Sequence, residues 1–146
     1  MPQQAAKPWG PKLNGAITLG LIFAGGALGT AARFAIGAAI PMDGWPWATF
    51  LANISGTAAL ALLVQVLAAF GPDTGWRRRT RLGLGTGLLG GYTTYSTFAL
   101  ETVALSQGFD VWLGFAYCVA SLLAGLAIAL FVFYLTDRFL RVRAPE

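Results

Sequence analysis

The chain has 146 residues, of which 56% are hydrophobic and only 11% are charged, and its formal net charge is +4. A soluble domain carries about 25% charged residues, and a small fold has too little volume to bury so much apolar surface. This composition excludes an ordinary soluble domain and indicates that lipid solvates the apolar excess. The chain has no histidine and one cysteine, Cys118, which also excludes an internal disulfide and a multi-thiolate metal site.

Four apolar stretches are long enough to cross a bilayer, which requires about 20 residues in a helix. They cover residues 16–40, 48–70, 82–105 and 111–135. Short links make successive helices antiparallel neighbours. We therefore predict an all-α membrane protein with four transmembrane helices in one domain, residues 15–136. A flexible N-terminal tail, residues 1–14, precedes it, and a basic cytoplasmic tail, residues 137–146, follows it. A cleaved signal peptide is the alternative for the first stretch, but its length, its glycines and Arg33 favour a spanning helix.

The basic residues predict the orientation in the membrane. The two tails and the middle link hold nine of the ten: Lys7, Lys12, Arg77, Arg78, Arg79, Arg81, Arg138, Arg141 and Arg143. The other two links hold no Lys or Arg, only Asp43 and Asp110. Because Lys and Arg are enriched in cytoplasmic loops, we predict a multi-pass protein of the cell membrane with both termini in the cytoplasm. The same placement explains the positive charge without a nucleic-acid partner.

The first two stretches each contain a polar side chain that is costly in lipid. Placing Arg33 at mid-bilayer costs at least ~2.5–3.5 kcal/mol. Its side chain either reaches an interface or lines a water-filled vestibule that attracts an anion. Asn53 either makes a hydrogen bond between helices or donates its amide N–H groups to a passing anion.

The third stretch is the most unusual part of the sequence. Gly83, Gly87 and Gly91 recur every four residues, which is typical of a face for close helix approach. Residues 92–98 then read YTTYSTF, a poor helix-forming sequence. We predict a break near mid-membrane, where freed carbonyls bind cations and freed N–H groups bind anions. The alternative is a glycine-hinged packing helix with Ser and Thr bonded to the backbone. Glu101, one turn further on, faces either a wet cavity or the interface.

Together, these motifs resemble those of the Fluc family of small fluoride channels, also called CrcB. Residues 25–33, GGALGTAAR, look like the family's GGxxGAxxR, and residues 49–57, TFLANISGT, look like its TxxxNxxGS. Residues 90–98, GGYTTYSTF, followed by Glu101, are similar to its GGFTTFSTFxxE. Tyr117 and Ser121 match its Tyr-xxx-Ser pair in the fourth helix. The resemblance covers residues 25–121 in the family's order.

The resemblance implies an antiparallel dimer with two pathways through which fluoride leaves the cell passively. It implies a structural Na⁺ at the dimer centre, held by backbone carbonyls at the positions of Gly90 and Thr93. Seven more positions match residues of the fluoride pathway: Asn53, Tyr95, Ser96, Thr97, Phe98, Tyr117 and Ser121. Arg33 matches the arginine of the vestibule.

Two features depart from the family's pattern. Tyr95 stands where Phe is usual, so its hydroxyl either donates to fluoride, or obstructs or polarises one pathway. The one-sided distribution of basic residues predicts insertion in a single orientation. We therefore expect an antiparallel heterodimer with a paralogue of opposite charge bias.

Three other classes of protein are alternatives. A small proton-coupled multidrug transporter also has four short helices, but it needs a carboxylate in the first helix, and residues 16–40 contain none. A non-conducting assembly subunit is the second alternative. An enzyme is not expected, because the sequence offers no nucleophile–base pair and no metal cluster.

Overall fold

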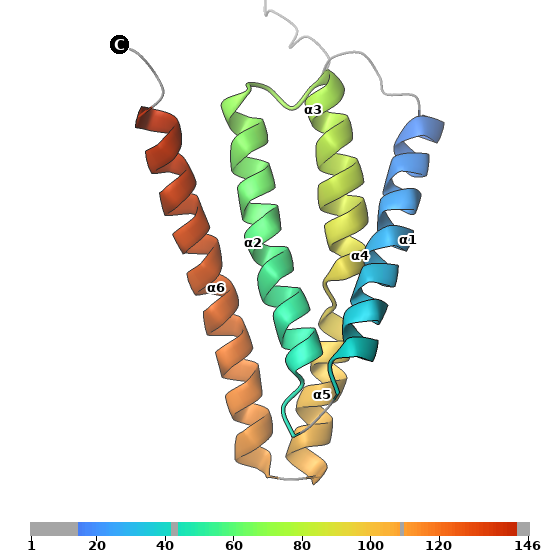
Figure 1. Ribbon diagram of the computed structural model, residues 1–146, viewed down its shortest axis with the longest axis vertical. Coiled ribbons are helices and arrows are strands. Elements are labelled where there is room, and N and C mark those ends of the chain that lie inside the picture. The colour runs from blue at the N-terminus through green and yellow to red at the C-terminus, as the bar shows by residue number, and fades with distance from the viewer. Residues whose placement is uncertain (1–14, 42–43, 109, 143–146) are drawn as a thin grey trace, which may run out of the picture.

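The computed structural model describes residues 15–41, 44–108 and 110–142, and it arranges them in helices (Figure 1). These are α1 (Gly15–Ala39), α2 (Trp47–Ala69), α3 (Gly75–Thr80), the π-helix η1 (Arg81–Leu89), α4 (Gly90–Tyr92), α5 (Tyr95–Gly108) and α6 (Val111–Val142). The predicted N-terminal tail, Asp43 and the last four residues of the predicted C-terminal tail lie outside the described residues.

The helices form four antiparallel columns: α1, α2, the run from α3 to α5, and α6 (Figure 1). The third column packs against α1 and α2, while α6 packs against α2 and α5. Within the described residues, three helices are long and apolar enough to cross a membrane: Gly15–Ala39, Trp47–Ala69 and Val111–Leu140. The structure thus shows an all-helical chain with the apolar spans of an integral membrane protein. The predicted stretch 82–105 is divided among shorter segments, and its crossing as a fourth span stays a prediction.

The structure adds detail at two of the predicted boundaries. Helix α6 continues to Val142, so residues 137–142 of the predicted C-terminal tail are helical. Leucine and arginine are good helix formers, and basic residues interact favourably with the carbonyl end of a helix. The helix therefore continues beyond the end of the apolar run. The predicted middle link, residues 71–81, contains the short helix α3, which runs directly into η1.

The segment η1 is a π-helix, where an α-helix is expected from the sequence. It reads RLGLGTGLL, and its glycines lack the Cβ atoms that restrict backbone conformation. The wider turns of a π-helix are rare, and they occur frequently at functional sites. Here a single short segment, α4, separates the π-helix from the region where helical geometry ends.

Glycines let α1 lie very close to η1 and α4. A Cβ atom on Gly29 would collide with the carbonyl oxygen of Leu88, and one on Gly91 would collide with that of Gly26. The predicted close approach of the glycine face is therefore confirmed at Gly91. This approach brings α1, and Arg33 with it, against the end of α4.

Candidate functional site

The chain leaves helical geometry at two threonines between α4 and α5. Thr93 has φ −80° and ψ 158°, which turns its carbonyl away from the axis of α4. Its N–H and its hydroxyl both donate to the carbonyl oxygen of Leu89, at 3.0 and 2.9 Å. Thr94 accepts a 3.2 Å hydrogen bond at Oγ1 from the N–H of Thr97, as a threonine at a helix N-cap does. Threonine side chains therefore close both helix ends at the interruption.

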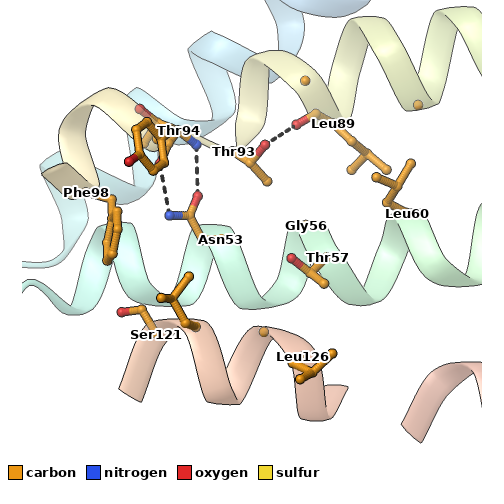
Figure 2. Close-up of a pocket in the computed structure, with 15 residues that line it drawn as sticks. Asn53, Gly56, Thr57, Leu60, Leu89, Thr93, Thr94, Phe98, Ser121 and Leu126 are labelled. Atoms are coloured by element: carbon orange, nitrogen blue, oxygen red, sulfur yellow. Dashed lines mark hydrogen bonds between the residues drawn. The ribbon is translucent and has the colours of Figure 1, made fainter. Parts of the chain in front are cut away.

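Asn53 of α2 binds the interruption from the side (Figure 2). Its Nδ2 donates to the carbonyl oxygen of Thr94 at 3.0 Å, and the Thr94 N–H donates to Asn53 Oδ1 at 2.8 Å. This pairing matters because an unpaired backbone group in lipid costs several kcal/mol. The geometry supports the role of Asn53 in bonding between helices. The carboxamide has a second Nδ2–H donor that this pair does not use.

A cavity of about 470 Å³ lies beside the interruption, between α2, the third column and α6 (Figure 2). Six of the residues singled out from the sequence line it: Gly90, Thr93, Asn53, Tyr95, Phe98 and Ser121. Among the described residues, Ser121 Oγ is buried without a hydrogen-bond partner. Much of the remaining wall is leucine and glycine, so a few polar groups face a largely apolar space.

Tyr95 and Phe98 lie next to each other on α5 but differ in exposure. Their ring centroids are 5.9 Å apart. Phe98 is 8% exposed and belongs to the small buried core, whereas Tyr95 is 80% exposed. Ring edges carry partial positive charge and can contact an anion. Phe98 therefore presents its ring from within the chain, while Tyr95 projects from the surface.

A second cavity, of about 450 Å³, contains two more of these residues, Arg33 and Thr97, together with Thr49 and Glu101. Arg33 is half-buried, and its Nε donates to the carbonyl oxygen of Gly91 at 3.3 Å. The guanidinium thus contacts the last turn before the interruption and also lines a cavity. This position supports the vestibule interpretation over a side chain that only reaches an interface.

Glu101 accepts two short hydrogen bonds from buried side chains. Thr49 Oγ1 donates to Oε1 at 2.7 Å, and the Tyr117 hydroxyl donates to Oε2 at 2.8 Å. Thr49 is 6% exposed and Tyr117 is fully buried. The Tyr117 ring packs against Phe98, with centroids 5.4 Å apart. This network ties α2, α5 and α6 together next to the interruption.

Comparison with known proteins places the chain in a family. The family model described as "CrcB-like protein, Camphor Resistance (CrcB)" matches residues 20–133. The chain belongs to the CrcB family. This membership confirms the family predicted from the motifs, and the matched region contains every site residue predicted from the sequence.

Curated relatives of this CrcB-family chain are named as ion channels. "Fluoride-specific ion channel FluC 1" of Cutibacterium acnes is 45% identical over 116 residues, which cover 77% of this chain and 80% of the relative. "Fluoride-specific ion channel FluC 2" of Leifsonia xyli subsp. xyli is 46% identical over 108 residues, 73% of this chain and 74% of the relative. "Fluoride-specific ion channel FluC 1" of Mycobacterium bovis is 42% identical over 110 residues, 74% and 81% of the two chains. The family is thus one of channels and not of enzymes.

The structure does not bring all the predicted residues together. Tyr117 and Ser96 line neither of the two cavities, since Tyr117 is buried and Ser96 lies on the surface of this CrcB-family chain. Their roles in an ion pathway stay predictions. Sequence reasoning missed Thr49 and Thr94 as site residues. Both lie within the motifs quoted above. Thr49 precedes Asn53 by one helical turn, and this spacing could have indicated that the two side chains share a helix face.

Proposed function

We propose that this chain is one subunit of a channel that conducts fluoride passively out of the cell and thereby lowers fluoride toxicity in the cytoplasm. The observation that carries the proposal is the interruption at Thr93 and Thr94, where hydroxyl, amide and aromatic groups gather beside a cavity. Fluoride is small and strongly hydrated, so donors must replace its water while still releasing it. The membrane potential drives an anion outward by about 2.3 kcal/mol per 100 mV, so export needs no energy coupling.

The proposed topology has four spans, with the third column crossing the membrane and interrupted near its middle. The start of α1, helix α3 and the end of α6 lie at the same end of the molecule (Figure 1). The arginines of the described termini and links lie at that end, on α3, η1 and α6: Arg77, Arg78, Arg79, Arg81, Arg138 and Arg141. This arrangement supports an orientation in the cell membrane with both termini in the cytoplasm.

A second, antiparallel subunit would complete the pathway. Tyr95 is 80% exposed, and a hydroxyl group without a partner is unfavourable in hydrocarbon. Ser96 is also exposed, although its hydroxyl is hydrogen-bonded to that of Thr94 at 3.2 Å. A neighbouring subunit would cover both and present its own donors to the ion. Because the charge bias allows one orientation only, we propose that this subunit is a paralogue of opposite bias. Liposomes with the purified chain alone should then release no fluoride, and co-expression with the paralogue should restore release. Conduction by the chain alone would contradict the heterodimer.

We also propose a structural Na⁺ at the centre of the dimer. The carbonyls of Gly90 and Thr93 would hold it, because both residues line the cavity and the Thr93 carbonyl is turned out of its helix. A hard cation prefers such oxygen ligands, and its charge would hold two interruptions together. Replacing Na⁺ by N-methylglucamine during purification should weaken the dimer, as measured by size-exclusion chromatography with light scattering. An unchanged dimer in the absence of Na⁺ would contradict this site.

A fluoride-electrode efflux assay tests the function directly. Proteoliposomes that contain the chain together with its partner subunit and are loaded with potassium fluoride should release fluoride when valinomycin is added, whereas vesicles loaded with chloride should not release chloride. Phe98→Ile keeps an apolar side chain but removes the aromatic ring, and it should abolish efflux while the protein remains monodisperse. Equal release of chloride would exclude a fluoride-selective channel. Absence of fluoride release in every subunit combination would favour an assembly subunit that does not conduct.

A further inference from the structure

The arginine-rich end of the molecule contains a groove that the proposed channel function does not use. Its volume is about 260 Å³. Residues of α2 near its end form an apolar wall: Val64, Leu67 and Ala68. The chain that follows α2 contributes Gly71, Asp73, Arg77 and Arg81 to the remaining lining. The groove therefore changes from apolar to charged at the end of α2, the position at which a spanning helix leaves hydrocarbon.

The guanidinium of Arg77 is held in place by a backbone carbonyl and an aromatic ring. Its Nε donates to the carbonyl oxygen of Pro72 at 2.7 Å, and it lies 5.8 Å from the centroid of the Trp76 ring. These contacts fix its orientation. The Asp73 carboxylate interacts with Arg77 electrostatically but makes its ion pair with Arg81, so Arg77 has no ion pair of its own among the described residues. A guanidinium fixed in this way is well suited to bind an anionic oxygen, because arginine presents a planar set of donors that matches phosphate.

Asp73 is the only acid in the lining of the groove, and it is already paired. Arg81 donates to Asp73 Oδ2 from Nη2 at 2.7 Å and from Nε at 3.1 Å. Arg78 and Arg79 follow Arg77 on α3. This end of the third column thus has four arginines, and Asp73 interacts with three of them, Arg77, Arg78 and Arg81, so the surface has an excess of positive charge.

Aromatic rings indicate the depth of the groove in the membrane. Phe70 and Trp76 are 62% and 55% exposed, and their ring centroids are 5.9 Å apart. Exposed tryptophan favours the headgroup level of a bilayer. The arginines therefore lie at headgroup depth, and the apolar wall of α2 extends from there toward the acyl chains.

We propose that this groove binds an anionic phospholipid of the adjoining leaflet. The phosphate contacts the guanidinium groups of Arg77 and Arg81, and an acyl chain lies along Val64, Leu67 and Ala68. Two observations identify this occupant. The arginines are complementary in charge to the phosphate, and they lie at headgroup depth while the apolar wall lies at the depth of the acyl chains. Orienting the chain in the membrane requires only positive charge on this side, whereas a lipid site also requires the groove and the fixed guanidinium. The site is independent of fluoride conduction.

Native mass spectrometry of the full chain in detergent tests the site, with phosphatidylglycerol and phosphatidylcholine offered together. The wild-type protein should retain phosphatidylglycerol about tenfold more than phosphatidylcholine. Arg77→Gln should lower that retention about fivefold, because one basic residue near an anionic surface contributes roughly that factor. Arg138→Gln makes the same charge change at the same end, outside the groove, and should have no such effect. Equal retention of the two lipids, or equal loss in both variants, would overturn the proposal.

A second pair of variants tests the apolar wall without changing charge. Ala68→Trp fills the groove and should abolish retention of phosphatidylglycerol. Leu62→Trp places the same side chain elsewhere on the surface of α2 and should leave retention unchanged. If Ala68→Trp retains the lipid, the acyl chain does not lie in this groove. This pair also decides the question if Arg77→Gln does not fold.

A soluble headgroup distinguishes a lipid site from a simple anion site. Glycerophosphoglycerol, which lacks acyl chains, should not displace phosphatidylglycerol at tenfold excess. Displacement would show that the arginines alone bind the anion and would contradict the proposed wall. Asp73→Asn removes the competing carboxylate from Arg81 and should increase retention of phosphatidylglycerol. A decrease would contradict a phosphate contact at Arg81.

Discussion

Asn53 and Thr94 are 41 positions apart in the chain and join through two hydrogen bonds, one in each direction. The side chain of one helix thus replaces, for one residue of another column, the backbone partners that a continuous helix would supply. The interruption is stable because Asn53 of α2 forms hydrogen bonds with both backbone groups of Thr94. Disturbing this pair should therefore affect folding and conduction together.

We expect Asn53→Ala to destabilise the protein and to abolish fluoride efflux. Both backbone groups of Thr94 lose their partners, and each unsatisfied buried group costs about 1–3 kcal/mol. Thermal unfolding in detergent measures the first effect, and the fluoride-electrode assay measures the second. Ser55→Ala is the control on the same helix. It removes hydrogen bonds to the Leu51 carbonyl and the Tyr92 hydroxyl but leaves both backbone groups of Thr94 paired, so it should cost less than half as much. An Asn53→Ala protein as stable as the wild type would show that Thr94 finds other partners.

Tyr95→Phe restores the ring that is usual in the family. Because the hydroxyl lies on an 80% exposed side chain, its removal should not disturb the subunit, and fluoride efflux should be unchanged or faster. The rate constant of efflux from liposomes that contain the complete channel measures this. Loss of efflux would show that the hydroxyl is required and that tyrosine is not a tolerated replacement here.

The network around Glu101 should show coupled losses of stability. Tyr117→Phe removes a hydrogen bond to a carboxylate, which contributes about 1.5–3 kcal/mol. Glu101→Gln should make the same tyrosine substitution less costly, with an interaction energy of about 0.5–3 kcal/mol in a double-mutant cycle. Tyr134→Phe on the same helix is the control, since Tyr134 is 61% exposed and should change stability by less than about 0.5 kcal/mol. Strict additivity of the two substitutions would contradict the network.

Gly29→Ala should disrupt the packing of α1 on the third column. The new Cβ meets the backbone carbonyl of Leu88, which cannot move without displacing η1, so we expect a loss of at least about 2 kcal/mol or failure to fold. Gly37→Ala on the same helix meets nothing within 4 Å and should be neutral or stabilising, because alanine favours a helix over glycine. Yield of monodisperse protein and its melting temperature distinguish the two. Similar behaviour of both variants would contradict the close approach.

Hydropathy and helix chemistry allow much of the architecture to be predicted. The predicted stretches 16–40 and 48–70 differ from α1 and α2 by one residue at each end, because apolar composition determines where such helices lie. The glycine pair before YTTYSTF pointed to the segment in which the chain leaves helical geometry. Composition could not reveal that α6 extends to Val142, since its last turns are amphipathic and no longer apolar.

The partners within the candidate site could not be read from the sequence. Asn53 left two interpretations open, and only the position of Thr94 across the helix interface favours one of them. Glu101 was undecided because its two donors, Thr49 and Tyr117, come from other columns. The π-helical form of η1 depends on its packing against α1 as well as on its glycines, and local propensity does not include that packing.

Helix α6 is longer than the hydrocarbon layer, and its buried residues, Gly114 and Tyr117, both lie in its first two turns. Its 32 residues extend about 48 Å, against about 37 Å for the 25 residues of α1, whereas the hydrocarbon core of a bilayer is about 30 Å thick. None of the residues in its most apolar part is buried within the chain. Acyl chains or a neighbouring subunit must fill the space along it, and a long helix in a thin bilayer tilts. The tilt of α6 therefore depends on the thickness of the host bilayer. Because Tyr117 is part of α6, a change in this tilt would also shift the residues that surround Glu101.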